Sequence, residues 1–216
     1  MKLNLFKKKI TNNKDLLPKK NYWIENFKTF FIAILIALTL RTFAFEPFSI
    51  PSGSMKPTLL EGDYLFVSKY SFGYSKHSFP MSFPNYSGRI FGNYPERGDI
   101  AVFKFTKNTK IDYIKRIVGL PGDKIQVKDG ILYLNNTAIE RKSKGSWRAK
   151  DRNNIMQTYE RYEEKLSDDF IYDVLDATPN GMLDNTDVYT VPEGHIFAMG
   201  DNRDQSSDSR ILSQLG

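Results

Sequence analysis

The sequence predicts a mostly β chain, in which one N-terminal transmembrane helix precedes an antiparallel, barrel-like β-domain with a variable inserted subdomain. Three observations carry this prediction: an apolar run behind a lysine-rich start, many short β-rich runs separated by Gly and Pro, and a highly charged middle section. The predicted parts are a basic tail at 1–22, a transmembrane helix at 23–45, a core at 46–123 and 188–216, and the insertion at 124–187.

The composition of the 216 residues is that of a folded protein, with 40% hydrophobic and 14% aromatic residues. Because there is no cysteine, disulfides, cysteine-ligated zinc and a thiol nucleophile are excluded. His77 and His195 are the only histidines, which argues against a multi-histidine metal centre. We therefore expect neither a metal nor an organic cofactor.

Positive charge is concentrated at the start of the chain. Residues 1–22 hold seven lysines and one aspartate, a charge of +6 that equals the net charge of the whole chain. The remainder is close to neutral, whereas a nucleic-acid-binding domain carries a basic patch of its own, so no nucleic-acid partner is expected. Taken alone, the tail fits a solvated basic arm. The segment that follows it favours a location beside a membrane instead.

An apolar segment of roughly 17 residues follows between Lys28 and Glu46, and this is about the lower length limit of a transmembrane helix. Arg41 interrupts it near one end, where a long side chain can snorkel to the headgroups. Tyr22 and Trp23 lie where an interfacial aromatic belt is expected.

Two other interpretations of this segment compete. A cleaved signal peptide needs small residues at its cleavage site, whereas residues 42–45 are bulky. A buried globular helix fits poorly behind a lysine-rich tail. We therefore predict a spanning helix in contact with the lipid bilayer, with the N-terminus in the cytoplasm and everything after Glu46 outside it.

Beyond residue 46 the pattern changes to short strands and turns. Runs rich in β-formers and bounded by Gly or Pro predict strands at 64–67, 99–105, 113–118, 125–127, 131–134 and 195–199. The turn at 128–130 joins two of these runs as a hairpin. Such a series is typical of an antiparallel, barrel-like body.

Two stretches differ from this pattern. Residues 71–95 are rich in Ser, Tyr, Phe, Gly and Pro, and they predict an extended loop or ribbon. Residues 141–186 are highly charged and predict a surface insertion of lower functional weight. Within it, 159–166 is either a short helix or a strand, because its periodicity does not decide.

The most informative pattern lies in residues 48–59, where Pro51 and Pro57 bracket a Ser-Gly-Ser run. Proline fixes φ and glycine permits unusual backbone angles, so this segment can form a stiff platform. A nucleophilic serine requires such a rigid setting and a neighbouring base. An ordinary turn is the alternative for a serine beside a glycine.

Lys115 is the best candidate for the base. It lies in the run 113–118 beside apolar neighbours such as Ile114, and burial there would lower its pKa from the usual value of about 10.4. The alternative is a surface lysine with its ammonium in water. A Ser-His-Asp triad would need His77, in the irregular stretch, or His195, at a strand start where a surface or packing role is favoured.

Four sequence blocks resemble those of bacterial type I signal peptidases, also called leader peptidases. Residues 51–59 are similar to the nucleophile motif, 112–123 to the lysine motif, 97–103 to a structural block and 200–210 to the C-terminal motif. The resemblance implies an endopeptidase of the bacterial inner membrane, anchored by one span. It would cleave N-terminal signal peptides from exported preproteins after small residues of the Ala-x-Ala type, on the periplasmic side.

The resemblance also implies a role for each matching residue. Ser54 would be the nucleophile and Lys115 the general base. The Ser52 hydroxyl and the Ser54 backbone N–H would stabilise the oxyanion. Ser206 would hydrogen-bond the lysine and orient it.

The remaining matches imply supporting and substrate-binding roles. Asp208 and Arg210 would form a structural ion pair near the site, and Asp201 and Arg203 would hold the loop. Shallow pockets for small substrate side chains would be lined by Phe48, Ile50, Pro51, Met55 and Ile114.

Two other function classes stay open. Self-cleaving repressors of the LexA type use the same Ser–Lys chemistry, but they are soluble and carry a DNA-binding domain, which the apolar segment and the near-neutral body disfavour. A single-span envelope protein that uses its β-domain for binding is the non-enzymatic alternative, and it predicts no dependence on Ser54 or Lys115.

The chain ends soon after the fourth block, whereas the resembled peptidases usually continue with further strands. We expect the shorter end to leave an open sheet edge and a thinner core, and to lower activity.

Overall fold

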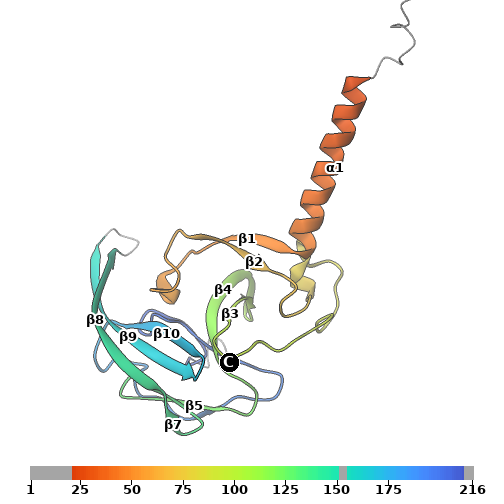
Figure 1. Cartoon of the computed structure of the whole chain (residues 1–216). Coiled ribbons are helices and arrows are strands. Elements are labelled where there is room, and N and C mark those ends of the chain that lie inside the picture. Colours follow the sequence, from red (N-terminus) through yellow and green to blue (C-terminus); the bar gives the residue numbers. More distant parts are fainter. Residues whose placement is uncertain (1–20, 151–154, 212–216) are drawn as a thin grey trace, which may run out of the picture. The chain divides into compact units, whose positions relative to one another are not determined.

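A computed structural model describes residues 21–150 and 155–211 (Figure 1). By its contacts the chain divides into two units, 1–41 and 42–216. Nearly all of the first unit that is described belongs to α1 (Tyr22–Phe43), a helix of 22 residues. The predicted basic tail lies outside the described residues except for its last two.

α1 is long and apolar enough, by length and composition, to cross a membrane. Its mean hydropathy is 1.6 in the most apolar window, and none of its residues is buried. At 1.5 Å per residue, 22 residues extend about 33 Å, which matches the hydrocarbon core of a bilayer. The predicted helix at 23–45 is therefore confirmed as a helix, ending two residues earlier because the chain enters a strand at Phe45.

In the described part of the second unit, antiparallel strands form four sheets. The first sheet holds β1 (Phe45–Ser49) and β2 (Tyr64–Ser68). The second has the order β12 (Phe197–Met199), β4 (Asn108–Gly119) and β3 (Ile100–Phe105). The third runs β11 (Tyr189–Thr190), β5 (Lys124–Lys128), β6 (Ile131–Leu134) and β7 (Thr137–Ala138). The fourth runs β10 (Phe170–Asp176), β9 (Met156–Ser167) and β8 (Glu140–Lys150).

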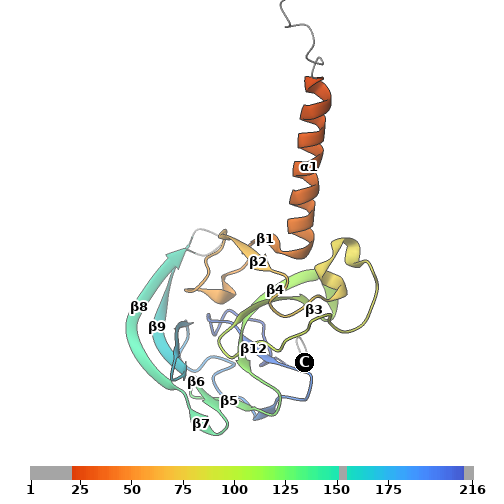
Figure 2. The same cartoon turned by 45° about the vertical axis from the view of Figure 1, so that its right-hand side comes forward.

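This architecture confirms the prediction of a mostly β, antiparallel chain with one N-terminal helix. Within the described residues the strand ladders form separate sheets, and no single closed barrel joins them. Residues 159–166, which the sequence left between helix and strand, belong to β9. Figure 2 shows β8 and β9 as a long curved pair at the edge of the unit.

The predicted insertion and the predicted core share one sheet and one hydrophobic cluster. β5, from the segment 124–187, pairs with β11, from the segment 188–216. Val174 of β10 packs in the same buried cluster as Val118 of β4 and Phe197 of β12. The predicted boundary between insertion and core stays a prediction, but these two segments are held together by apolar packing.

The stretch 71–95 contains little regular structure, as predicted. It forms two short 3-10 turns, η3 (Lys76–Ser78) and η4 (Pro80–Ser82), and one isolated bridge between Tyr74 and Ile90. Several of its residues also line a cavity, described below.

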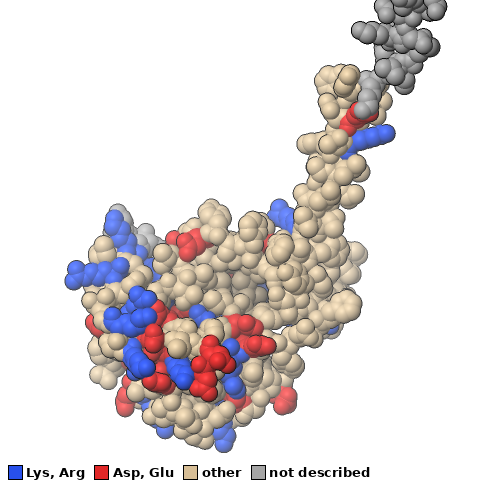
Figure 3. All heavy atoms as spheres, viewed as in Figure 1, with Lys and Arg blue, Asp and Glu red and all other residues tan. Residues whose placement is uncertain are grey.

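Charged side chains gather over β8, β9 and β10, where both signs are interspersed (Figure 3). Typical pairs are Lys144 with Asp173, at 2.9 Å, and Lys142 with Glu140, at 2.9 Å. The prediction of a charged surface in this region is therefore confirmed. A few of its charges point inward, and these contribute to the site.

Candidate active site

The two residues at the centre of the site come from segments 61 positions apart. Ser54 lies in η2 (Gly53–Met55), directly after β1, and Lys115 lies in the middle of β4, opposite Ala101 of β3. The Lys115 Nζ is 2.8 Å from the Ser54 Oγ, within hydrogen-bond distance. Both residues are buried, with exposed fractions of 4% and 5%.

Lys115 is a buried amine without an ion-pair partner among the described residues. Its Nζ contacts the Ser54 hydroxyl and the Ile114 carbonyl oxygen, at 3.0 Å, and lies 5.3 Å from the centre of the Tyr113 ring. Burial lowers the pKa of Lys115 to about 8, although the charges of Asp208 and Asp201 act in the opposite direction. With this pKa roughly a tenth of the amine is uncharged at pH 7 and about half at pH 8, so the amine can act as a general base near neutral pH.

The nucleophile segment is fixed by the loop after β12. The Asn202 backbone N–H donates to the Ser54 carbonyl oxygen at 3.0 Å, and its side-chain amide donates to the Gly53 carbonyl oxygen at 3.1 Å. Asn202 is fully buried. Because a main-chain and a side-chain bond hold adjacent carbonyls, the backbone at Ser54 has little freedom to move.

Ser52 lies beside the nucleophile, as the predicted oxyanion role requires. Its Oγ is 3.3 Å from the Ser54 Oγ, and its backbone is extended at the N-terminal end of η2. The Ser52 hydroxyl is half-buried and close enough to the reacting oxygen to donate to a substrate carbonyl.

Ser206 is buried next to the site, but its predicted hydrogen bond to Lys115 is not formed. The Lys115 Nζ is directed to Ser54 and Ile114 instead, and the Ser206 hydroxyl helps to lower the pKa of the Asp208 carboxyl. Ser206 packs closely against Gly200, where a side chain would clash with it and would lie 2.5 Å from the Ser54 carbonyl oxygen. Glycine at position 200 is thus a condition for the two segments to approach each other.

Asp208 and Arg210 form the expected ion pair, at 2.9 Å, and both are buried. Burial alone would raise the pKa of Asp208, but the charge and hydrogen bonds of Arg210 outweigh it and hold the pKa below its usual range. Arg210 also donates to the Arg203 carbonyl oxygen at 2.6 Å. The pair therefore fixes the loop behind Lys115.

Asp201 likewise has a structural role, as expected. Its carboxylate accepts from Arg116, with a closest distance of 2.6 Å, and from the Thr58 hydroxyl at 2.5 Å. Arg116 also donates to the Gly98 carbonyl oxygen at 2.7 Å. This buried network joins the end of the nucleophile segment to β4 beside Lys115.

The predicted substrate-pocket residues divide into two groups. Phe48 and Ile114 line an open cavity of about 1290 Å³, which extends from β1 and β4 to the 71–96 stretch. Ile50 and Met55 are buried and pack against Ile114 instead of lining this cavity. Pro51 is exposed and does not border it, so this cavity contains two of the five residues, and the predicted shallow pockets beside Ser54 stay a prediction.

The cavity does not include Ser54 or Lys115 among its lining residues. Its closest approach to the dyad is Ile114, which directly precedes Lys115 in β4. The dyad and the cavity are thus neighbours along one strand.

A buried charge cluster contributes a residue that the sequence analysis did not single out. Glu164 of β9 is fully buried and pairs with Arg203, with distances of 2.6 and 3.1 Å. The Tyr172 hydroxyl of β10 donates to the Glu164 carboxylate at 2.8 Å. Strands of the charged middle region therefore anchor the loop that carries Asn202. In the sequence the only signal was Arg203 itself, which lies in the block 200–210.

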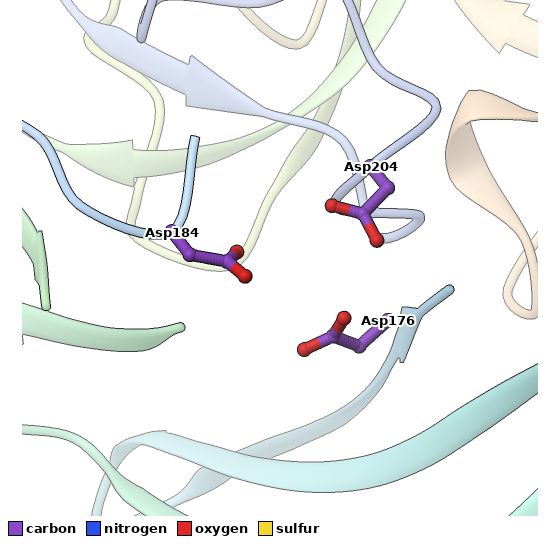
Figure 4. A group of neighbouring side chains, drawn as sticks. All are labelled: Asp176, Asp184 and Asp204. Carbon is purple, nitrogen blue, oxygen red and sulfur yellow. The ribbon is translucent and has the colours of Figure 1, made fainter. Parts of the chain in front are cut away.

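Three carboxylates lie close together at the end of β10, those of Asp176, Asp184 and Asp204 (Figure 4). One oxygen from each lies within 4.8 Å of the others. Each already has protein partners: Asp176 pairs with Arg141, and the other two accept backbone N–H groups. These contacts account for the cluster without an ion, and the expectation of no metal stays a prediction.

A family model described as signal peptidase, peptidase S26, matches residues 23–216. Among known proteins, the signal peptidase I of Rickettsia akari (strain Hartford) is 43% identical over 210 residues, which cover 93% of this chain and 75% of that protein. The signal peptidase I of Rickettsia prowazekii (strain Madrid E) is 41% identical over 209 residues, which cover 92% and 77%.

A crystal structure of a signal peptidase I from Enterococcus faecalis V583 is 29% identical to this chain. It covers 55% of this chain and 86% of the other, with a TM-score of 0.30. At this TM-score the likeness adds nothing to the fold described above.

Proposed function

The chain belongs to the signal peptidase family, peptidase S26, and from this premise we propose that it cuts signal peptides from exported preproteins with a Ser54–Lys115 dyad. The observation that carries the proposal is the 2.8 Å separation of the Ser54 Oγ and the Lys115 Nζ, both buried and without a carboxylate bound to the amine. A buried lysine beside a serine hydroxyl suits proton transfer near neutral pH.

The reaction begins when the uncharged Lys115 amine takes the Ser54 proton as the Oγ attacks the scissile carbonyl carbon. The carbonyl oxygen becomes an oxyanion, stabilised by the Ser54 backbone N–H and the Ser52 hydroxyl. When the C–N bond breaks, the Lys115 ammonium gives its proton to the leaving amine. Water, deprotonated by the same amine, then releases the signal peptide from Ser54.

The preference for small residues before the cut follows from the packing beside the dyad. Of the five predicted pocket residues, Ile50 and Met55 pack against Ile114, and Phe48 and Ile114 line the neighbouring cavity. We infer that the apolar side chains packed beside Ser54 select small residues, as at Ala-x-Ala sites.

α1 supports a membrane-anchored enzyme with a single span. The lysine-rich start then lies in the cytoplasm by the positive-inside rule, and the β unit lies on the outer side of a bacterial inner membrane. Preproteins and the lipid bilayer are the partners of this arrangement.

The test is cleavage of a precursor with an Ala-x-Ala site by the full chain in detergent, followed on a gel. We expect Ser54→Ala and Lys115→Ala to abolish cleavage, whereas Ser167→Ala and Lys110→Ala, at exposed strand positions, leave it unchanged. A precursor with Phe at the last position before the cut should persist. Cleavage at the wild-type rate by either dyad variant would contradict the dyad, and absence of cleavage by the unaltered chain would favour a binding protein of the envelope.

A further inference from the structure

Lys56 is a buried lysine that the proposed reaction does not use. It lies two residues after Ser54 and is only 3% exposed, whereas lysines are almost never fully buried without a partner. Its Nζ donates to the Lys150 carbonyl oxygen at 3.2 Å and lies 3.4 Å from a carboxylate oxygen of Glu61. Two partners from different parts of the chain therefore hold this ammonium inside the protein.

These groups lie directly against the backbone of the nucleophile segment. The Lys56 backbone N–H donates to the Gly53 carbonyl oxygen at 3.2 Å and closes η2. A side chain at Gly53 would lie 3.1 Å from the Lys56 Nζ and 2.6 Å from Glu61. The ammonium and the carboxylate thus occupy the space that a Gly53 side chain would take, next to Ser54.

The strand pair β8–β9 is attached to the nucleophile segment at a second place. The Tyr159 hydroxyl of β9 donates to the Gln205 side chain at 3.1 Å, and the Asn202 amide donates to the same oxygen at 3.2 Å. Asn202 in turn holds the Gly53 and Ser54 carbonyls. The segment is therefore bound to the β8–β9 pair through Asn202 on one side and through Lys56 on the other.

We propose that Lys56 is a positioning residue for Ser54: with Glu61 and the Lys150 carbonyl it clamps the nucleophile segment to the end of β8. The inference rests on the proposed peptidase function and deepens it. Ser54 and Lys115 belong to different elements with no shared strand ladder, so the 2.8 Å between their reacting atoms depends on how the segment is held.

The kinetic consequence follows from the sensitivity of proton transfer to distance. A displacement of about 1 Å can lower a rate on the order of 100-fold, even when the altered residue does not touch the substrate. Loss of the clamp should lower kcat, because it moves the Ser54 Oγ relative to the Lys115 Nζ. It should leave KM unchanged, because Phe48 and Ile114 at the cavity remain in place.

The test compares Lys56→Met and Lys56→Arg in the full chain, with kcat expressed per folded enzyme. We expect Lys56→Met to lower kcat about tenfold or more at unchanged KM, and Lys56→Arg to stay within about threefold of wild type, since arginine keeps a charged donor. Lys150→Ala is the matched control: it removes a lysine but keeps the backbone carbonyl that Lys56 binds, so its kcat should equal wild type.

A purely structural role would give a different result. Lys56→Met would then lower the thermal midpoint and the folded fraction but leave kcat per folded enzyme at the wild-type value, which overturns the proposal. If Lys56→Met does not fold, Glu61→Gln decides, because Glu61 is 24% exposed at its side chain and tolerates substitution better. An unchanged kcat there also overturns the proposal. Failure of the proposed function is distinguishable, since it shows as activity of Ser54→Ala.

Discussion

Lys115 and Arg203 are both 4% exposed, yet their surroundings have opposite effects on their charge. Lys115 faces a serine hydroxyl and a carbonyl oxygen, and burial lowers its pKa to about 8. Burial would also lower the pKa of Arg203, but the charge and hydrogen bonds of Glu164 outweigh it and raise the pKa above the ordinary value. One region therefore holds a base that can lose its proton near neutral pH, and the other holds a permanent cation.

The difference shows that a carboxylate partner, more than depth, decides the charge of a buried basic group. Desolvation penalises the charged form in both regions, and only an ion pair with good geometry compensates for it. The Glu164–Arg203 pair stabilises a loop, whereas the amine of Lys115 is left available for proton transfer. Each prediction below alters one side of this comparison.

The largest effect on stability is expected when Arg203 loses its carboxylate partner. Glu164→Gln leaves Arg203 buried without its counter-charge, and removing one partner of a buried pair typically costs about 3 to 5 kcal/mol of unfolding free energy. Glu163→Gln is the matched control on the neighbouring position of β9, where the side chain is partly exposed and pairs with Lys144. Urea denaturation at neutral pH checks both, and equal stability of the two variants would contradict the account.

Lys115, which has no carboxylate partner in the described part of the chain, should make the stability of the fold depend on pH. The pKa of Lys115 is about 8 in the folded chain and 10.5 in its ordinary state, so the unfolded chain binds more protons between these values. Stability relative to Lys115→Met should therefore rise with pH across this window, by about 3 kcal/mol in total. Denaturation of both proteins from pH 7 to 11 measures the difference, and a constant difference would show that the amine is not desolvated.

A substitution at Asp208 should have a smaller effect, because it alters the pKa of Lys115 only through a neighbouring charge. Its negative charge raises the pKa of Lys115, and the positive charge of Arg210 lowers it. Asp208→Asn removes the first effect and leaves the second uncompensated, so the pH at which precursor cleavage reaches half its maximum should fall. A rise in this pH, measured on the same precursor, would mean that the two charges do not act on Lys115 as described.

No effect is expected from an exposed pair of the charged surface. Glu140 and Lys142 lie 2.9 Å apart but are 54% and 66% exposed at their side chains. Solvent screens such a pair, so Glu140→Gln should leave the midpoint of thermal unfolding unchanged. A clear drop in the midpoint would show that charge in this region stabilises the fold even when exposed.

Local sequence patterns were sufficient to predict the functional residues that lie within short motifs. The Ser-Gly-Ser run between two prolines predicted a rigid segment around Ser54, and apolar neighbours predicted a buried Lys115. The hairpin at β5 and β6 and the loop at 71–95 were also predicted, because turn residues specify such features locally.

Features that depend on distant contacts were not predicted. Glu164 looks like any other charged residue of the middle region, and only the sheet β10-β9-β8 brings it to Arg203. The sequence likewise gave no signal for the burial of Lys56, since its acceptor is a backbone carbonyl 94 positions away. Backbone acceptors are present at every residue, so a pattern of side chains cannot reveal them.

The central claim is that an uncharged Lys115 amine activates Ser54, and the pH dependence of precursor cleavage tests it most directly. We predict that kcat/KM rises with pH and reaches half its maximum near pH 8, the value to which burial lowers the pKa of Lys115 in the free enzyme. Half-maximal activity near pH 10.5, the ordinary value for a solvated lysine, would contradict the account.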